Sequence, residues 1–179
     1  MGWLFFKKVE KPAEVVAVEE FNKKLGELLA NENYISVRDY SFLVEQFSGT
    51  NKAFITINDS GLLSAYCKKN KIKLEFINTF LSSFKNLKNI ISSHNKEFVK
   101  SYMVQQKKYL DEILFNIDKN IVLDEDQRKV VLTDEDYCLV IAGAGAGKTT
   151  TVAAKVKYLV DKKNIKPEEI LIISFTNSN

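Results

Sequence analysis

Hydrophobic residues recur at helical spacing along the first third of the chain. One stripe begins shortly after Pro12, with successive gaps of three, four and three residues, and consists of Val18, Phe21, Leu25 and Leu28. Apolar positions three or four residues apart lie on one face of an α-helix. The pattern therefore predicts a helix that starts near Ala13 and buries this stripe.

The segment after this helix contains a second helix signal and an ambiguous run. Ser36 and Asp39 have the spacing of a capping box, so we expect a helix from there to Phe47, ended by Ser48 and Gly49. Residues 54–57, Phe-Ile-Thr-Ile, precede the turn-forming residues 58–61. They are predicted to form either a short strand or an extended loop.

Two longer helical patterns occupy residues 77–117. The first stripe contains Ile77, Phe80, Phe84, Leu87 and Ile91. The second contains Phe98, Tyr102, Tyr109 and Ile113. Residues 92–95, Ser-Ser-His-Asn, separate the two stripes and supply side chains suited to cap a helix. The pattern predicts an antiparallel helical hairpin with aromatic residues in its core.

The character of the chain changes near its C-terminal end. Residues 137–142 are a short, mostly apolar run that includes Cys138, residues 148–162 have a helical pattern, and residues 170–174 are a second apolar run. Such runs bounded by turn-forming residues are typical of buried strands. We therefore expect strand, loop, helix and strand, with Cys138 as a small core residue.

The loop between the first strand and the helix has the composition of a phosphate-binding loop. Its small residues let consecutive backbone N–H groups face an anion, and the following helix adds the positive end of its dipole. Lys148 supplies a cation for the outer phosphates and Thr149 a hydroxyl for Mg²⁺, so these two are the candidate catalytic residues. The alternative is an ordinary glycine-rich turn. The predicted ATP-binding residues here are Ala142, Gly143, Ala144, Gly145, Ala146, Gly147, Lys148, Thr149 and Thr150.

Residues on both sides of the loop extend the pattern. In order, the chain shows L-x-x-x-Q-x-x-x-V at residues 123–131, A-G-A-G-x-G-K-T-T at residues 142–150, and I-L-x-x-S-F-T-N at residues 170–177. This order resembles the start of a superfamily 1 DNA helicase of the UvrD/Rep type. Among these helicases it is most similar to helicase IV, which also places a long leader before the glutamine motif.

The resemblance implies roles for residues that composition alone does not single out. Gln127 would read adenine, because a carboxamide offers one kind of donor and one kind of acceptor to the base edge. The family touches single-stranded DNA through positions that correspond to Phe175, Thr176 and Asn177, where aromatic stacking tolerates any base. The family's next residue is often Lys, whereas this chain has Ser178.

The resemblance also implies an organisation. Residues 1–120 would be a helical leader with the predicted hairpin, which is rich in lysine, and residues 121–179 the start of a RecA-like nucleotide-binding domain. The expected fold class is α/β, with a mainly helical N-terminal region and an incomplete RecA-like layer. The function implied is the N-terminal portion of an ATP-dependent 3′-to-5′ DNA helicase that uses ATP and Mg²⁺ and acts on single-stranded or forked DNA.

Such helicases place further acidic residues, an arginine finger and a second motor domain downstream of these motifs. Phosphoryl transfer needs those groups, so these residues alone are not expected to hydrolyse ATP or unwind DNA. The missing motor domains or a protein partner would cover the incomplete layer. The alternative is a non-catalytic module that binds DNA or a protein and keeps a remnant of the loop; a small P-loop kinase or GTPase fits the flanking motifs less well.

Charge and composition refine this interpretation. The formal net charge is only +3, but residues 68–108 contain ten lysines against Glu75 and Glu97. This cluster is either a solvated helix face or a surface for DNA phosphates. The two cysteines have no metal-binding spacing, and no apolar run reaches the ~20 residues of a membrane span. A cytoplasmic protein without membrane contact is the natural expectation.

Overall fold

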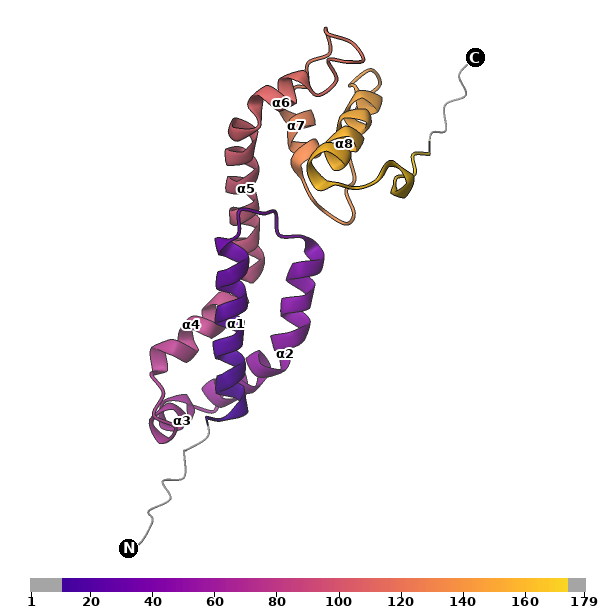
Figure 1. Cartoon of the computed structure of the whole chain (residues 1–179). Coiled ribbons are helices and arrows are strands. Elements are labelled where there is room, and N and C mark those ends of the chain that lie inside the picture. The colour runs from indigo at the N-terminus through magenta and orange to yellow at the C-terminus, as the bar shows by residue number, and fades with distance from the viewer. Residues whose placement is uncertain (1–10, 174–179) are drawn as a thin grey trace, which may run out of the picture. The chain divides into compact units, whose positions relative to one another are not determined.

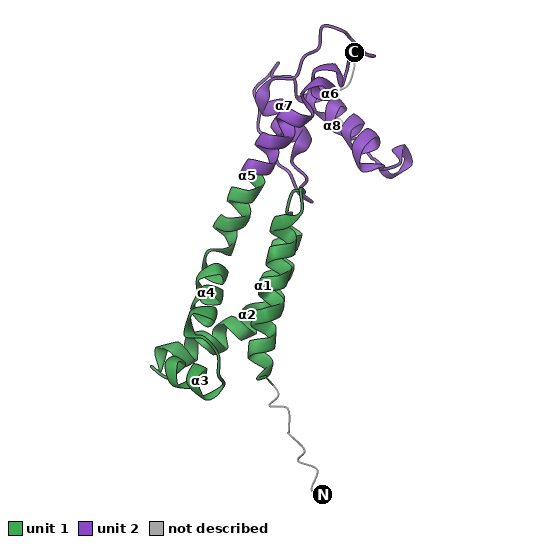
Figure 2. Cartoon of the chain, turned by 60° about the vertical axis from the view of Figure 1, so that its left-hand side comes forward, with its two compact units in different colours: residues 1–95 green, residues 96–179 purple. Residues whose placement is uncertain are grey.

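The computed structural model describes residues 11–173. These residues are mostly helical and form no β-strand. Contacts between residues divide the chain into two compact units, Met1–Asn95 and Lys96–Asn179 (Figures 1 and 2). The mainly helical leader is therefore confirmed. The predicted division at residues 120 and 121 stays a prediction about domain organisation.

The first unit is built from α1 (Ala13–Ala30), α2 (Val37–Asp59), α3 (Leu63–Lys69), α4 (Leu74–Lys85) and the first part of α5 (Leu87–Gln105). Helix α1 starts at the predicted residue and buries Val18, Phe21 and Leu25. The ring of Phe21 packs edge-on against Phe47 at 5.4 Å and Phe80 at 5.1 Å between ring centroids. Helices α1, α2 and α4 lie side by side (Figure 1), and an aromatic cluster in the core joins them.

Helix α2 begins as predicted but ends twelve residues later. The hydroxyl of Ser36 accepts a hydrogen bond from the backbone N–H of Asp39, and the Asp39 carboxylate accepts one from the backbone N–H of Ser36. The predicted stop at Ser48 and Gly49 is wrong, because α2 continues to Asp59 and buries Phe54 completely. Both alternatives for residues 54–57 are wrong as well. Burial of a large aromatic side chain outweighs the ~1 kcal/mol that a glycine costs inside a helix.

The predicted break at residues 92–95 is also wrong, and so is the hairpin that depended on it. The chain breaks at Asn86 between α4 and α5, and α5 runs through residues 92–95 without interruption. The polar side chains there bind a distant segment instead. The Asn95 carboxamide accepts from the Ile35 N–H at 2.9 Å and donates to the Ile35 carbonyl at 2.8 Å. His94 lies 3.0 Å from the Asn33 carbonyl.

The second unit contains the end of α5, α6 (Lys107–Glu112), α7 (Glu125–Leu132), α8 (Lys148–Lys163) and a short 3₁₀ helix, η1 (Pro167–Glu169). Its core joins α6, α7 and α8 and consists of Leu110, Ile113, Leu114, Leu123, Val131, Leu132, Ala154 and Tyr158. Helix α8 confirms the predicted helix after the glycine-rich loop.

Neither predicted strand forms within the described residues. Residues 139–142 and 170–173 carry no regular structure, and Leu139, Ile141 and Leu171 are each more than four-fifths exposed. Cys138 is exposed, so its assignment to the core is wrong. A strand needs a neighbour to receive its backbone hydrogen bonds, and none pairs with these segments here. Their apolar side chains remain as surface that a sheet would cover.

Candidate functional site

The loop before α8 takes its shape from two of its glycines. Gly145 and Gly147 have φ values of +75° and +71°, a left-handed conformation that residues with a Cβ rarely adopt. Gly147 is the N-cap of α8, whose 16 residues begin at Lys148. The loop also closes a turn, because the Ala146 N–H donates to the Gly143 carbonyl at 3.4 Å. The alternation of Ala and Gly in the sequence thus places glycine at both left-handed positions.

The first turn of α8 leaves backbone N–H groups facing the loop. Such groups have no partner within a helix and, with the helix dipole, attract an anion. Thr151 stabilises this turn, since its hydroxyl donates to the Gly147 carbonyl at 3.0 Å. Thr149 is exposed in the same turn and Thr150 is half-exposed. The hydroxyl predicted to bind Mg²⁺ is therefore accessible at the loop.

Lys148 points back over the loop. Its ammonium group donates to the Ala142 carbonyl at 3.1 Å and to the Gly143 carbonyl at 2.7 Å. An ammonium group has three N–H donors, so one remains available. Residues 143–146 around it are exposed. The structure thus brings the predicted phosphate-binding cation together with the loop and the helix N-terminus.

Gln127 joins the same site from α7. It is the third residue of that helix, where its backbone N–H donates to the Asp124 carboxylate at 2.8 Å and its side-chain oxygen accepts from the Asp124 N–H at 3.1 Å. Its amide nitrogen donates to the Ala146 carbonyl at 3.3 Å. A Cβ built on Gly147 would lie 2.5 Å from that nitrogen, which is closer than real Cβ atoms approach. A side chain at this position would require the carboxamide to move, and the left-handed φ of Gly147 independently favours glycine.

Two contacts that the sequence did not reveal fix α7 to its neighbours. The Lys155 ammonium donates to the Val131 carbonyl at 2.9 Å and the Thr133 carbonyl at 2.6 Å, at the C-terminal end of α7. Burial lowers the pKa of Lys155. Lys155 lies four residues after Thr151 and three before Tyr158, so helical spacing in the sequence already places it on the buried face of α8. That spacing is the signal that could have identified it.

Arg128 provides the second contact. Its guanidinium donates to the Leu123 carbonyl at 2.8 Å and pairs with Asp111 of α6 at 2.7 Å. Hydrogen bonds from Lys107 and Arg128 lower the pKa of Asp111. Helix α7 is therefore held by α6 on one side and by α8 on the other. The remaining predicted site residues, Phe175, Thr176 and Asn177, lie outside the described residues.

Comparisons with known proteins concern the same segment. Residues 123–179 match the model of the UvrD/REP helicase N-terminal domain. A probable DNA helicase II homolog from Mycoplasma capricolum is 43% identical over 56 residues, which are 31% of this chain and 8% of the relative. The ATP-dependent DNA helicases PcrA of Staphylococcus epidermidis and Staphylococcus aureus are 42% and 40% identical over 55 residues, with the same coverage.

This chain therefore spans about 8% of the length of these relatives. No solved structure matches it significantly. The relatives are named DNA helicase II homolog and PcrA, so the greater likeness to helicase IV stays a prediction. The matched segment contains Gln127, the glycine-rich loop and α8. Residues 123–179 of this chain are thus similar to the N-terminal domain of the UvrD/REP helicases.

Proposed function

We propose that this chain is the nucleotide-binding start of an ATP-dependent 3′-to-5′ DNA helicase, preceded by a helical accessory region. The observation that carries the proposal is the arrangement around Gly147. A left-handed glycine loop, the N-terminus of α8, the Lys148 ammonium and the Gln127 carboxamide meet there. Cations and unpaired backbone N–H groups bind phosphate, and a carboxamide binds a base edge.

The hydrogen bonds already made by Lys148 support this role. Two of its three donors are held by neutral carbonyl groups of the loop, which places the charge over the loop. Hydrogen bonds between ions are stronger than those to neutral carbonyl groups. A triphosphate would therefore take the third donor and compete for the other two. Bound Mg²⁺ would neutralise phosphate charge, with the Thr149 hydroxyl as its ligand from this chain.

The hydrogen bonds of Gln127 support its proposed reading of adenine. A carboxamide has two N–H donors and an oxygen with two lone pairs. One donor is used by the Ala146 carbonyl and one lone pair by the Asp124 N–H. One donor and one acceptor remain, which is what the edge of adenine requires. The group is thus oriented before the nucleotide arrives.

We propose binding of nucleotide without efficient hydrolysis for these residues taken alone. Across residues 11–173, no group of three or more His, Cys, Asp or Glu side chains is placed to hold a metal ion. The acidic groups of a complete phosphoryl-transfer site would come from other parts of a longer helicase.

Phe175, Thr176 and Asn177 would contact single-stranded DNA. No helix among the described residues is long and apolar enough to cross a membrane, and we propose a cytoplasmic location.

Titration calorimetry with Mg²⁺ and ATP tests the nucleotide site. Lys148→Ala is expected to remove most of the affinity, because it deletes the side-chain cation that lies over the loop. Lys157→Ala is the matched control, since Lys157 lies on the same helix and pairs with Asp161 at 2.9 Å. Equal binding by the wild type and Lys148→Ala would refute the proposed site. Absence of binding by the wild type would favour the non-catalytic module.

A further inference from the structure

The turn between α3 and α4 concentrates positive charge at one point of the first unit. Lys68 and Lys69 end α3, Lys71 lies in the turn and Lys73 caps α4. All four side chains are exposed, and none makes an ion pair within residues 11–173. We call these four residues the basic turn.

Lysines elsewhere in the same unit behave differently. Lys24 pairs with Glu20 at 3.1 Å and Lys23 with Glu27 at 3.8 Å, so the charge of α1 is largely compensated. The nearest carboxylate in sequence to the basic turn is Glu75, which makes no ion pair in the described part of the chain. The basic turn therefore presents four cations without local partners, which is the electrostatic pattern of a surface for a polyanion.

The backbone of the basic turn places Lys71 in a conformation that is unusual for lysine. The Ile72 N–H donates to the Cys67 carbonyl at 2.9 Å and the Lys71 N–H to the Lys68 carbonyl at 3.3 Å, which together form a Schellman motif. Lys71 occupies the left-handed position with a φ of 56°. Glycine is the usual residue there because a Cβ destabilises this conformation. A lysine held in a strained position suggests a use for its side chain.

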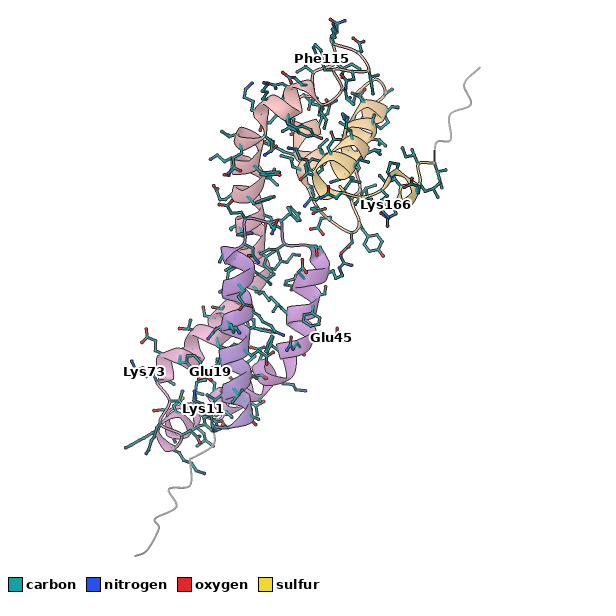
Figure 3. The ribbon with its side chains drawn as sticks, viewed as in Figure 1. Lys11, Glu19, Glu45, Lys73, Phe115 and Lys166 are labelled. Atoms are coloured by element: carbon teal, nitrogen blue, oxygen red, sulfur yellow. The ribbon has the colours of Figure 1, made fainter. Side chains whose placement is uncertain are left out.

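The basic turn also borders a cavity of about 270 Å³. Asn70, Lys71 and Lys73 line it together with Val15 and Phe76, and the ion pair of Lys11 and Glu19 lies at the same cavity. Figure 3 labels Lys11, Glu19 and Lys73 at this end of the first unit. Cations on one side and apolar side chains on the other suit a phosphate with an attached sugar or base. The cavity distinguishes this surface from lysines on a convex helix face.

We propose that the basic turn binds the phosphate backbone of DNA. That the polymer is DNA rests on the proposed helicase function. The place where it binds follows from the charge of the basic turn, the left-handed Lys71 and the neighbouring cavity. Lysine is a point charge on a flexible stem, so it contacts phosphates without reading bases. Four phosphates on a single strand give a log–log salt slope of roughly −3, at about 0.7 per phosphate.

Fluorescence anisotropy of a labelled single-stranded oligonucleotide tests this, with salt titrations. Combined reversal of Lys68, Lys69 and Lys73 to Glu should weaken binding by roughly tenfold or more and flatten the salt slope by about 2. The control is combined reversal of Lys52, Lys119 and Lys166, three exposed lysines outside the basic turn. Both triple variants change the net charge equally. The control should keep most of the affinity.

Lys71→Gly separates charge from folding. Glycine relieves the left-handed strain, so the thermal midpoint should stay equal or rise. DNA affinity should nevertheless fall about two- to fivefold, and the salt slope should decrease by about 0.7, because one phosphate contact is lost. This combination of unchanged or higher stability with weaker binding is not expected of a lysine with a purely structural role.

Four results would overturn the inference. These are no DNA binding by the wild type, unchanged affinity after reversal of the basic turn, an equal loss in the control triple variant, and equally effective competition by a polyglutamate peptide of matched charge. The last would identify an acidic protein segment as the partner. Binding of Mg²⁺-ATP is measured separately with the Lys148 variants, so failure of the nucleotide site and failure of the basic turn are distinguishable.

Discussion

Replacing Lys155 with methionine tests whether α7 is fixed to α8 by its buried ammonium group. Methionine keeps a stem of similar length but removes both hydrogen bonds, leaving the Val131 and Thr133 carbonyl groups without their donor. It also removes a cation that lies 5.5 Å from the centroid of the Tyr158 ring. The change therefore isolates the charged donor rather than the packing of the side chain.

The expected loss of stability follows from two opposing contributions. Hydrogen bonds from a charged donor contribute ~1.5–3 kcal/mol each, so two of them give about 3–6 kcal/mol. Burial of the ammonium offsets part of this, as the lowered pKa of Lys155 shows. We expect a net destabilisation of about 2 kcal/mol, concentrated at the C-terminal end of α7. Lys155→Arg should retain most of the stability because it keeps charged donors.

Urea denaturation followed by circular dichroism, together with hydrogen exchange of the α7 amides, measures this effect. Lys157→Met is the matched control, because it removes only the partly exposed pair with Asp161 on the same helix. Such pairs contribute at most about 0.5 kcal/mol. An unchanged midpoint and unchanged α7 exchange in Lys155→Met would refute the reasoning. An equal loss in Lys157→Met would refute it as well.

Three further predictions concern the same unit. Gly147→Val should abolish Mg²⁺-ATP binding in calorimetry, because valine rarely adopts the left-handed φ of Gly147 and its Cβ would displace the Gln127 carboxamide; binding at wild-type strength would contradict this. Gln127→Ala should narrow the difference between ATP and GTP affinity by about 1 kcal/mol, whereas Asp124→Ala, which breaks the same cap but keeps the carboxamide, should not. Asp111→Asn should lower the urea midpoint at neutral pH. The folded state lowers the pKa of Asp111, so its carboxylate contributes to stability above the unfolded pKa, and this contribution is lost as pH falls through the folded pKa. A difference in urea midpoint between the wild type and Asp111→Asn that persists in strong acid would contradict this origin.

The elements that the sequence predicted correctly depend on neighbouring residues. The capping box of Ser36 and Asp39 and the start of α1 after Pro12 each involve contacts within one turn of helix. The helix after the glycine-rich loop is similar, since Gly145 and Gly147 have left-handed backbone just before α8, whereas phosphate binding by this loop stays a prediction. A periodic pattern or a short motif contains all the information such features require.

The wrong predictions depend on distant contacts. Residues 92–95 suggested a break because Ser, His and Asn side chains commonly cap helices, yet Asn95 bonds to Ile35, sixty residues away. Burial of Phe54 in a core made by five helices extends α2 past Gly49. The strands expected at residues 137–142 and 170–174 need partner strands, which no local pattern supplies. Lys155 was missed for the same reason, because its acceptors lie on another helix.

Helix α7 is bound at both of its ends to residues in or near the proposed nucleotide site. Its N-terminal end carries Gln127, bonded to Ala146 immediately before α8, and its C-terminal end accepts from Lys155, seven residues into α8 beyond Lys148. Contacts at both ends and a shared core hold the two helices as one piece. The proposed base-reading amide and the proposed phosphate-binding lysine therefore come from two helices that are fixed to each other. Because Asp111 of α6 pairs with Arg128 beside Gln127, residues before the family match contribute to that geometry. A change in α6 is thus expected to act on recognition of the base through the position of α7, without contact to the nucleotide.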